Sequence, residues 1–261
     1  MRSLSVVLLA ALAVPGAALL AQTSQANHMH ALQYVPPYIQ AAVADPARGQ
    51  DASIDARRKI TDVMVFSQVK PGQKVLELIP GSGYFTRVFS GIVGVKGHVY
   101  ALWPNEYVKE DADEVSAFEK LAADPHYANV SVLKQPAAQL SVPEPVDIVF
   151  TSQNYHDYPD KFMGKVDPVA FDKQVYAALK PGGLFIVIDH VAPAGSGMAD
   201  TDTLHRIDPA IVKKQVESAG FVFAGESNVL RNPGDTHTLK VFDKSIRGHT
   251  DQFIYRFRKP G

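Results

Sequence analysis

The sequence predicts an α/β protein of three layers, in which helices cover both faces of a doubly wound, mostly parallel seven-stranded sheet. Three observations predict this fold class. Short segments that are apolar almost throughout alternate with segments of helical length, a pattern typical of parallel strands that are buried on both faces. A turn with two glycines, Gly81 and Gly83, follows the first of these strands. The last two predicted strands have no helix between them, so the final strand is expected to be antiparallel.

The elements follow in order along the chain. An amphipathic helix is predicted over residues 53–68, with Ile54, Ile60 and Val63 facing inward, and Lys70-Pro71-Gly72 ends it. The predicted strands span residues 74–78, 98–102, 130–133, 146–151, 184–189, 221–227 and 252–257. The helices that separate or follow them span residues 84–93, 111–122, 167–179 and 208–219. Residues 228–251 form a long connection, for which a functional lid and a solvated surface loop are both open.

The N-terminal residues have the outline of a secretory signal peptide. Arg2 precedes an apolar run over residues 6–20, and the small residues Ala21 and Ala26 follow it. The sequence therefore predicts a signal peptide (1–26), an N-terminal extension (27–50) and the main domain (51–261). We expect an exported protein, periplasmic or secreted; the alternative is an uncleaved N-terminal anchor.

Composition narrows the possible partners. The formal net charge is −1 and no basic stripe is present, which argues against a nucleic-acid partner. No segment beyond the predicted signal is long and apolar enough to span a bilayer, so no membrane partner is expected after cleavage. The chain has no cysteine, and therefore no disulfide and no thiolate chemistry. A small-molecule partner remains, and the oligomeric state stays open.

The glycine turn is the most informative motif. It stands between an apolar strand and a helix, where a backbone without Cβ atoms can bend sharply and let a ligand lie against it. The N-terminus of the following helix directs unpaired N–H groups at the same place. An ordinary tight turn is the alternative interpretation.

Two segments carry a resemblance to a known family: Val75-Leu-Glu-Leu-Ile-Pro-Gly-Ser-Gly83 and Leu179-Lys-Pro-Gly-Gly-Leu-Phe-Ile-Val-Ile188. With the order of elements, they make the chain similar to the class I S-adenosylmethionine-dependent methyltransferases over about residues 50–261. Within that family the chain most resembles a poorly characterised exported group of predicted methyltransferases. The resemblance implies a Rossmann-like methyltransferase fold with S-adenosylmethionine as the cofactor.

The resemblance also implies the cofactor-binding residues. Glu77 would lie near the ammonium and sulfonium of the methionine part, and Gly81 and Gly83 would let the backbone pass beneath the cofactor. Two departures from the family pattern are present. Ile79 replaces a small residue, and Trp103 stands where a ribose-binding carboxylate normally ends the second strand.

Substitutes for that carboxylate lie close by in the sequence. Trp103 is expected to stack on adenine, while Glu106 supplies the acceptor for the ribose hydroxyls. The alternative is that Trp103 merely packs at the end of the strand. Asn154 is a further candidate for cofactor binding, and it could equally satisfy loop backbone groups.

Candidate catalytic groups lie where the fourth and fifth strands end, because ligands bind beyond the C-terminal ends of parallel strands. His156 is the candidate base, and Asp157 is expected to orient its imidazole. The alternative is that His156 only caps a helix or fills the loop. Tyr155 is a candidate substrate contact, with the same alternative as Asn154.

Further candidate substrate contacts are Asp189 and His190 after the fifth strand and Arg247 in the long connection. The Asp189-His190 pair is similar to the Asp-Asn pair of metal-dependent O-methyltransferases, but Ser152 replaces the third ligand, so no metal is predicted. Asp208 and Pro209 have the pattern of a helix start, and His205 and Arg206 before them could reach the cleft. Arg231, Asp235, His237 and Asp251 are other possible lid residues.

The function predicted from the sequence is S-adenosylmethionine-dependent methyl transfer to an unidentified small molecule. The alternative is an exported protein of this fold that has lost methyl transfer and binds another small ligand. Hydrolase or lyase chemistry through His156, Asp189 and His190 is a third possibility.

Overall fold

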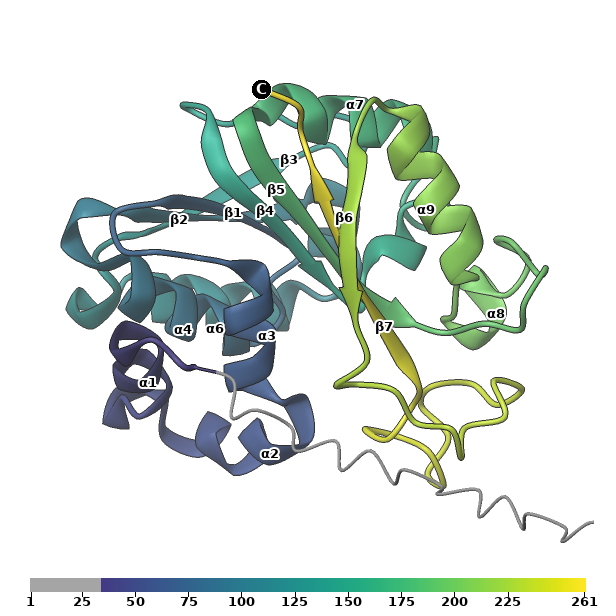
Figure 1. Cartoon of the computed structure of the whole chain (residues 1–261), viewed down its shortest axis with the longest axis horizontal. Helices are drawn as coiled ribbons and strands as arrows, with labels where there is room; N and C mark the ends of the chain where they lie inside the picture. Colours follow the sequence, from purple (N-terminus) through teal and green to yellow (C-terminus); the bar gives the residue numbers. More distant parts are fainter. Residues whose placement is uncertain (1–33) are drawn as a thin grey trace, which may run out of the picture. The chain divides into compact units, whose positions relative to one another are not determined.

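Seven strands form one sheet with the order β3-β2-β1-β4-β5-β7-β6 (Figure 1). The structure, a computed structural model, describes residues 34–261, so the predicted signal peptide lies outside the described residues. The strands are β1 (Lys74–Leu78), β2 (His98–Pro104), β3 (Val130–Gln135), β4 (Val146–Ser152), β5 (Leu179–His190), β6 (Val222–Ser227) and β7 (Gln252–Arg258). Strands β1 to β5 pair in parallel, whereas β7 runs antiparallel to both β5 and β6. The predicted fold class, with its antiparallel last strand, is confirmed.

Helices cover both faces of this sheet, which gives the three predicted layers. Figure 1 shows α3, α4 and α6 on one face and α7 and α9 on the other. The helices are α1 (Pro37–Val43), α2 (Asp55–Arg58), α3 (Ile60–Ser67), α4 (Tyr84–Val93), α5 (Asn105–Glu110), α6 (Ala112–Ala122), α7 (Pro168–Ala178), α8 (Thr201–Leu204) and α9 (Pro209–Ser218). No helix within residues 34–261 combines the length and the apolar character needed to cross a membrane.

The apolar strands build the core because both of their faces are covered. In β5, Ile186, Val187 and Ile188 are fully buried although neighbouring side chains point to opposite faces of the sheet. Aromatic rings join α4 to the sheet: the ring of Phe150 in β4 lies 4.8 Å from that of Phe85 and 5.0 Å from that of Phe89. This packing holds the helix that starts directly after the glycine turn.

The helix predicted over residues 53–68 is interrupted. Lys59 adopts a left-handed conformation (φ 49°), which separates α2 from α3. Side-chain contacts hold α2 in place: the Asp55 carboxylate accepts hydrogen bonds from Arg48 at 2.8 Å and from the Tyr84 hydroxyl, 29 residues away, at 2.7 Å. Arg58, at the end of α2, lines the cavity described below.

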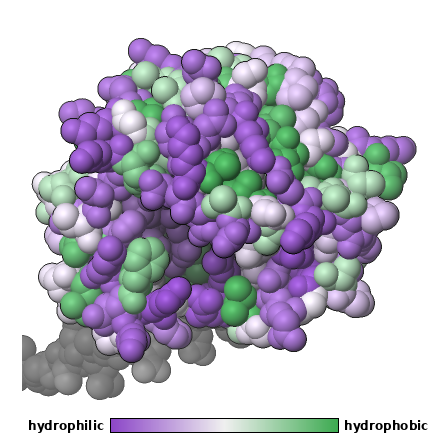
Figure 2. All heavy atoms as spheres, turned by 180° about the vertical axis from the view of Figure 1, so that it is seen from behind, coloured by the Kyte–Doolittle hydropathy of each residue, from purple (hydrophilic) through white to green (hydrophobic). Residues whose placement is uncertain are grey.

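Residues 35–50 belong to the same compact unit as the rest of the described chain. Within them, α1 buries Ile39 and Ala42 in the common hydrophobic core. The surface of the unit is mostly hydrophilic on the face shown in Figure 2, with hydrophobic residues in small areas.

The long connection between β6 and β7 contains no helix or strand, and ion pairs hold it. Arg206 donates two hydrogen bonds to Asp235, at 2.9 and 3.1 Å, and both side chains are buried. Asp251 accepts hydrogen bonds from Arg231 at 2.8 Å and pairs with His237 at 3.0 Å. Four predicted lid residues, Arg231, Asp235, His237 and Asp251, therefore hold the connection itself in place.

Candidate active site

A cavity of about 560 Å³ opens at the C-terminal ends of β1, β4 and β5, within the usual size range of small-molecule sites. Its lining combines the glycine turn, the ends of β4 and β5, and part of the long connection. The lining residues are Arg58, Glu77, Leu78, Ile79, Pro80, Gly81, Ser82, Tyr84, Phe85, Tyr107, Glu110, Asp111, Glu114, Ser152, Gln153, Asn154, His156, Asp157, Phe162, His190, His205, Val241 and Phe242.

The glycine turn forms one wall of the cavity. Gly83 does not line the cavity: it has φ 82°, and a Cβ atom there would lie 2.8 Å from Cδ1 of Leu121 in α6, so a larger residue would be strained and would displace that side chain. Gly81 has φ 57°, and its nearest neighbour for such an atom is Oε1 of Glu114 at 3.6 Å. Ile79 also has positive φ (49°), which is rare for a β-branched residue and typical of strained functional sites. Ile79 lines the cavity and leaves it open.

Glu77 lies at the end of β1 beneath the first turn of α4. The carboxyl is buried, and the hydroxyl of Thr86 donates a hydrogen bond of 2.6 Å to its Oε2. Burial raises the pKa of Glu77 to about 8, although the Thr86 hydrogen bond and the charge of Arg58 act in the opposite direction. The site therefore presents a carboxyl that a cationic ligand would ionise.

The structure does not place Trp103 and Glu106 at the cavity. Trp103 is fully buried, with its ring 5.4 Å from that of Tyr107 and 5.7 Å from that of Phe118, so it has the packing role. Strand β2 runs on to Pro104 and leads directly into α5, which turns Glu106 toward the connection between β3 and β4. There its Oε2 accepts a hydrogen bond of 2.7 Å from the backbone N–H of Ala137.

Tyr107 and Glu114 occupy the cavity wall instead. The Tyr107 hydroxyl donates a hydrogen bond of 3.2 Å to Oε2 of Glu114. Neither residue was predicted from the sequence, although a signal for Glu114 exists. Asp111 caps α6 by accepting a hydrogen bond of 3.0 Å from the Glu114 backbone N–H, and an Asp followed by Glu three residues later is typical of a helix start.

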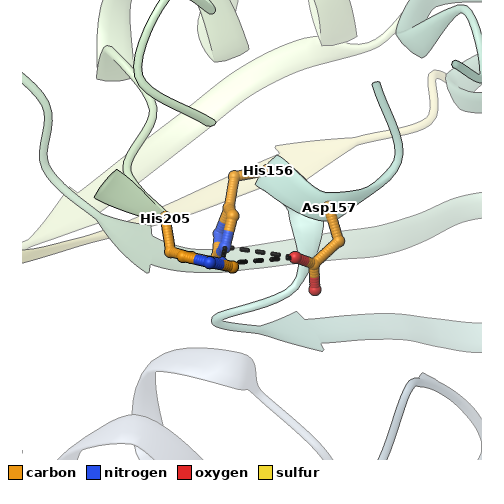
Figure 3. A group of neighbouring side chains, drawn as sticks. All are labelled: His156, Asp157 and His205. Carbon is orange, nitrogen blue, oxygen red and sulfur yellow. Dashed lines mark hydrogen bonds and ion pairs between the residues drawn. The ribbon is translucent and has the colours of Figure 1, made fainter. Parts of the chain in front are cut away.

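The opposite wall carries His156, Asp157 and His205, whose side chains point toward one another (Figure 3). The Nε2 atom of His156 lies 3.2 Å from Oδ1 of Asp157 and 3.4 Å from Nδ1 of His205. The sequence placed Asp157 as the residue that orients His156. Asp189 does so instead: its carboxylate contacts the Nδ1 atom of His156 at 2.8 Å and accepts the His156 backbone N–H at 2.9 Å.

Electrostatics divide the roles of these groups. Burial alone lowers the pKa of His156, but the carboxylates of Asp189 and Asp157 outweigh it and raise the pKa to about 9. Burial, with the charge of His156, lowers the pKa of His205 to about 4. Burial raises the pKa of Asp157 to about 6. These shifts favour the protonated form of His156 and the neutral form of His205, so His205 is the better placed of the two imidazoles to accept a proton.

The side chains of Asn154 and Tyr155 lie in different surroundings. Asn154 lines the cavity, where its Nδ2 atom donates a hydrogen bond of 3.3 Å to Oδ2 of Asp157. Tyr155 is fully buried outside the cavity, and its hydroxyl donates a hydrogen bond of 2.8 Å to Asp172 in α7. The short 3₁₀ turn at residues 155–157 directs successive side chains to different sides, so the predicted substrate contact at Tyr155 is wrong.

Asp189 and His190 also have separate surroundings. Asp189 is fully buried behind His156 and does not line the cavity, so the structure does not support the predicted substrate contact at Asp189. His190 lines the cavity, and its Nδ1 atom lies 2.8 Å from the Thr250 hydroxyl. Burial lowers the pKa of His190 to about 3, which keeps its imidazole neutral.

Arg247 lies in a second hollow of about 430 Å³ that shares residues with the cavity, among them Arg58 and His190. Arg57 also lines this hollow, and its Nη1 atom donates a hydrogen bond of 3.2 Å to the carbonyl of Gly248. Arg57 and Arg58 were not predicted as site residues, since both fall on the outward, polar side of the helix predicted over residues 53–68.

Comparison with known proteins identifies the family. Residues 20–167, more than half of the chain, match the family model described as protein-L-isoaspartate(D-aspartate) O-methyltransferase. The chain is 27% identical over 188 residues to the ubiquinone/menaquinone biosynthesis C-methyltransferase UbiE of Vibrio vulnificus (strain YJ016), an alignment covering 71% of this chain and 62% of that protein. It is 28% identical over 176 residues to the protein-L-isoaspartate O-methyltransferase of Methanococcus aeolicus, an alignment that covers 67% of this chain and 70% of that protein.

Solved structures show the same fold. An S-adenosylmethionine-dependent methyltransferase from Aquifex aeolicus superposes with a TM-score of 0.55 at 20% identity, over 87% of this chain and all of that chain. The chain spans 62% of the length of the UbiE protein of Vibrio vulnificus (strain YJ016). The part of the chain that matches the family model ends at residue 167, directly before α7. Together these findings show that the chain belongs to the protein-L-isoaspartate(D-aspartate) O-methyltransferase family, among the class I S-adenosylmethionine-dependent methyltransferases.

Proposed function

We propose that this protein is an S-adenosylmethionine-dependent methyltransferase that acts on a small molecule. The observation that carries the proposal is the continuity of one cavity. It joins the buried carboxyl of Glu77 and the glycine turn on one wall to His156, Asp157 and His205 on the other. Family membership supports the same reaction class.

The residues present fit the methyl donor. Glu77 would take the ammonium of its methionine part, because ionisation of a buried carboxyl beside a cation is favourable. The bare backbone at Gly81 would lie under the ligand, since only Oε1 of Glu114 is near its missing Cβ atom. Glu114 and Tyr107 would take the ribose hydroxyls, the role that the sequence assigned to Glu106. When bound, S-adenosylmethionine supplies an activated methyl group.

The other wall would hold the nucleophile. Orientation of the reacting groups can supply much of the rate of such a transfer, so the protein needs mainly to position them. His205 and Asp157 are proton acceptors beside His156 on this wall, since the pKa of each lies below neutral. His156 acts as a hydrogen-bond donor, which Asp189 fixes in orientation.

The second hollow would hold the rest of the substrate. Three guanidinium groups line it, from Arg57, Arg58 and Arg247, and no carboxylate does so among the residues that the structure describes. Burial lowers the pKa of Arg58, and its Nε atom is buried without a hydrogen-bond partner among the described residues, so a nearby anion would stabilise its charge. We therefore infer a substrate with a carboxylate or another anionic group.

We also propose that the protein is exported, as in the exported group of predicted methyltransferases that the sequence resembles. The basis is the pattern of Arg2 and the apolar run over residues 6–20. N-terminal sequencing of the protein recovered from a cell envelope fraction tests this. A mature protein that still starts at Met1 would contradict cleavage.

Calorimetry with S-adenosylmethionine tests the function. The intact protein should bind one equivalent, and Gly81→Arg should abolish the heat because the new side chain enters the cavity wall. Gly72→Arg is the matched control: Gly72 also has positive φ (80°), but open space surrounds its missing Cβ atom and it lies outside the cavity. Absence of binding to the intact protein would refute the proposal, as would equal loss in both variants.

A further inference from the structure

We propose that His156, Asp157 and His205 form a divalent metal site on the cavity wall. Their donor atoms are Nε2 of His156, Oδ1 of Asp157 and Nδ1 of His205 (Figure 3). The three separations are 3.2, 3.4 and 3.9 Å. Two ligands about 2.1 Å from a tetrahedral ion lie about 3.4 Å apart, so small side-chain adjustments suffice for coordination.

The surroundings of His156 are those of a metal-bound histidine. Asp189 contacts its Nδ1 atom at 2.8 Å, which leaves Nε2 as the atom that faces the cavity. The carboxylate is itself held by the backbone N–H groups of His156 at 2.9 Å and His190 at 2.7 Å. A carboxylate behind a ligating imidazole fixes the ring and makes its other nitrogen a better ligand.

Asp157 supplies a donor atom that other contacts leave free. Its Oδ2 atom accepts a hydrogen bond from Asn154, whereas no group within residues 34–261 donates one to Oδ1. The contact of Oδ1 with His156 is an ion pair outside hydrogen-bond geometry, and the Nε2 atom of His156 is directed at His205. Asp157 lines the cavity, so its Oδ1 atom is available to a cation that binds among these three atoms.

Two imidazoles and one carboxylate are a ligand set for zinc, iron, cobalt or manganese. The carboxylates of Asp157 and Asp189 together balance the charge of a divalent ion. All three ligands line the cavity, so the remaining coordination positions face the space where a substrate oxygen would bind. An ion there would lower the pKa of that oxygen. A metal ion would displace the proton from Nε2 of His156 and would occupy Nδ1 of His205. Methyl-transfer activity measured with and without metal therefore distinguishes metal activation of the substrate from proton acceptance by His205.

The experiment is a metal titration that needs no methyl donor, so it can fail or succeed independently of the proposed function. Tag-free protein is dialysed against a chelator and titrated with Co²⁺, while visible absorption reports the ligand field and elemental analysis reports the stoichiometry. We expect one equivalent with the spectrum of a protein-bound ion. Asp189→Asn should weaken binding by about 10- to 100-fold.

His205→Ala and Asp157→Asn should each abolish the spectrum. His126→Ala is the matched histidine control, because His126 is half exposed and pairs with Asp45 far from these ligands in the sequence. Circular dichroism confirms that each variant is folded, and the folded Asp157→Asn protein keeps the test valid if His205→Ala unfolds. The proposal is overturned if intact protein gives no spectrum, or if the ligand variants bind Co²⁺ as tightly as His126→Ala does.

Discussion

Replacement of Glu77 by glutamine should change how stability depends on pH. The carboxyl is buried, and its pKa rises from 4.5 to about 8 on folding. Between these two values the folded protein keeps a proton that the unfolded chain releases, so the stability of the native protein falls as pH rises. The neutral amide of Glu77→Gln has no such proton, and its oxygen can still accept the Thr86 hydroxyl.

The magnitude follows from the two pKa values. At about 1.4 kcal/mol per pH unit, the whole interval from 4.5 to about 8 corresponds to about 5 kcal/mol. Because a buried carboxyl is little screened by solvent, most of this difference should be measurable. Relative to the variant, the native protein should lose about 1.4 kcal/mol of unfolding free energy per pH unit within that interval.

Urea denaturation at several pH values between about 5 and 8 measures the effect. Glu106→Gln is the matched control for the substitution, since that carboxylate binds the Ala137 N–H outside the cavity. Parallel profiles for the native protein and Glu77→Gln would refute the reasoning, because they would mean that Glu77 ionises alike in both states. S-adenosylmethionine binding near neutral pH should also release close to one proton, detected by calorimetry in two buffers, and Glu77→Gln should release none.

Three further substitutions test the site and its support. Asp189→Asn should cost about 3–5 kcal/mol in urea denaturation, because it leaves the buried charge of His156 without its partner; a loss below about 1 kcal/mol would contradict that pairing. Gly83→Ala should lower the stability by about 1–3 kcal/mol, because the added carbon meets Leu121 at 2.8 Å; an unchanged melting temperature would argue against the contact. Trp103→Phe should lower the stability by about 1–2 kcal/mol and leave the affinity for S-adenosylmethionine unchanged, because the Nε1 atom of Trp103 has no partner within the described residues. A large loss of affinity would mean that the indole contacts the cofactor after all.

Much of the fold could be predicted because local pattern and tertiary structure agree. The first strand and the helix after the glycine turn have the predicted bounds, since apolar β-branched and leucine residues, then glycines, then an amphipathic run each favour one structure. The segment over residues 53–68 shows the limit. Its apolar spacing is that of one helix, yet the chain breaks at Lys59, and the contacts of Asp55 with Arg48 and Tyr84 that accompany the break are not encoded in that spacing.

The location of the site was predictable, and the direction of its side chains was not. Strand ends identified the neighbourhood of His156 and Asp189, because parallel strands end at the same edge of a sheet. Whether Tyr155 or Trp103 faces the cavity depends on packing against α7 and α6, which no local pattern encodes. His205 joins the group from a connection that lies 49 residues beyond His156.

The place of β7 has a consequence for biogenesis. This strand follows all the others in the chain, yet it lies between β5 and β6 and is their only link in the sheet. A nascent polypeptide cannot finish the sheet until the ribosome has released β7, and until then β5 and β6 both present unpaired edges. Asp251, which fastens the long connection beside the cavity, directly precedes β7. The site is therefore assembled last. A shortened chain that lacks β7 should fold poorly and should be cleaved readily by proteases.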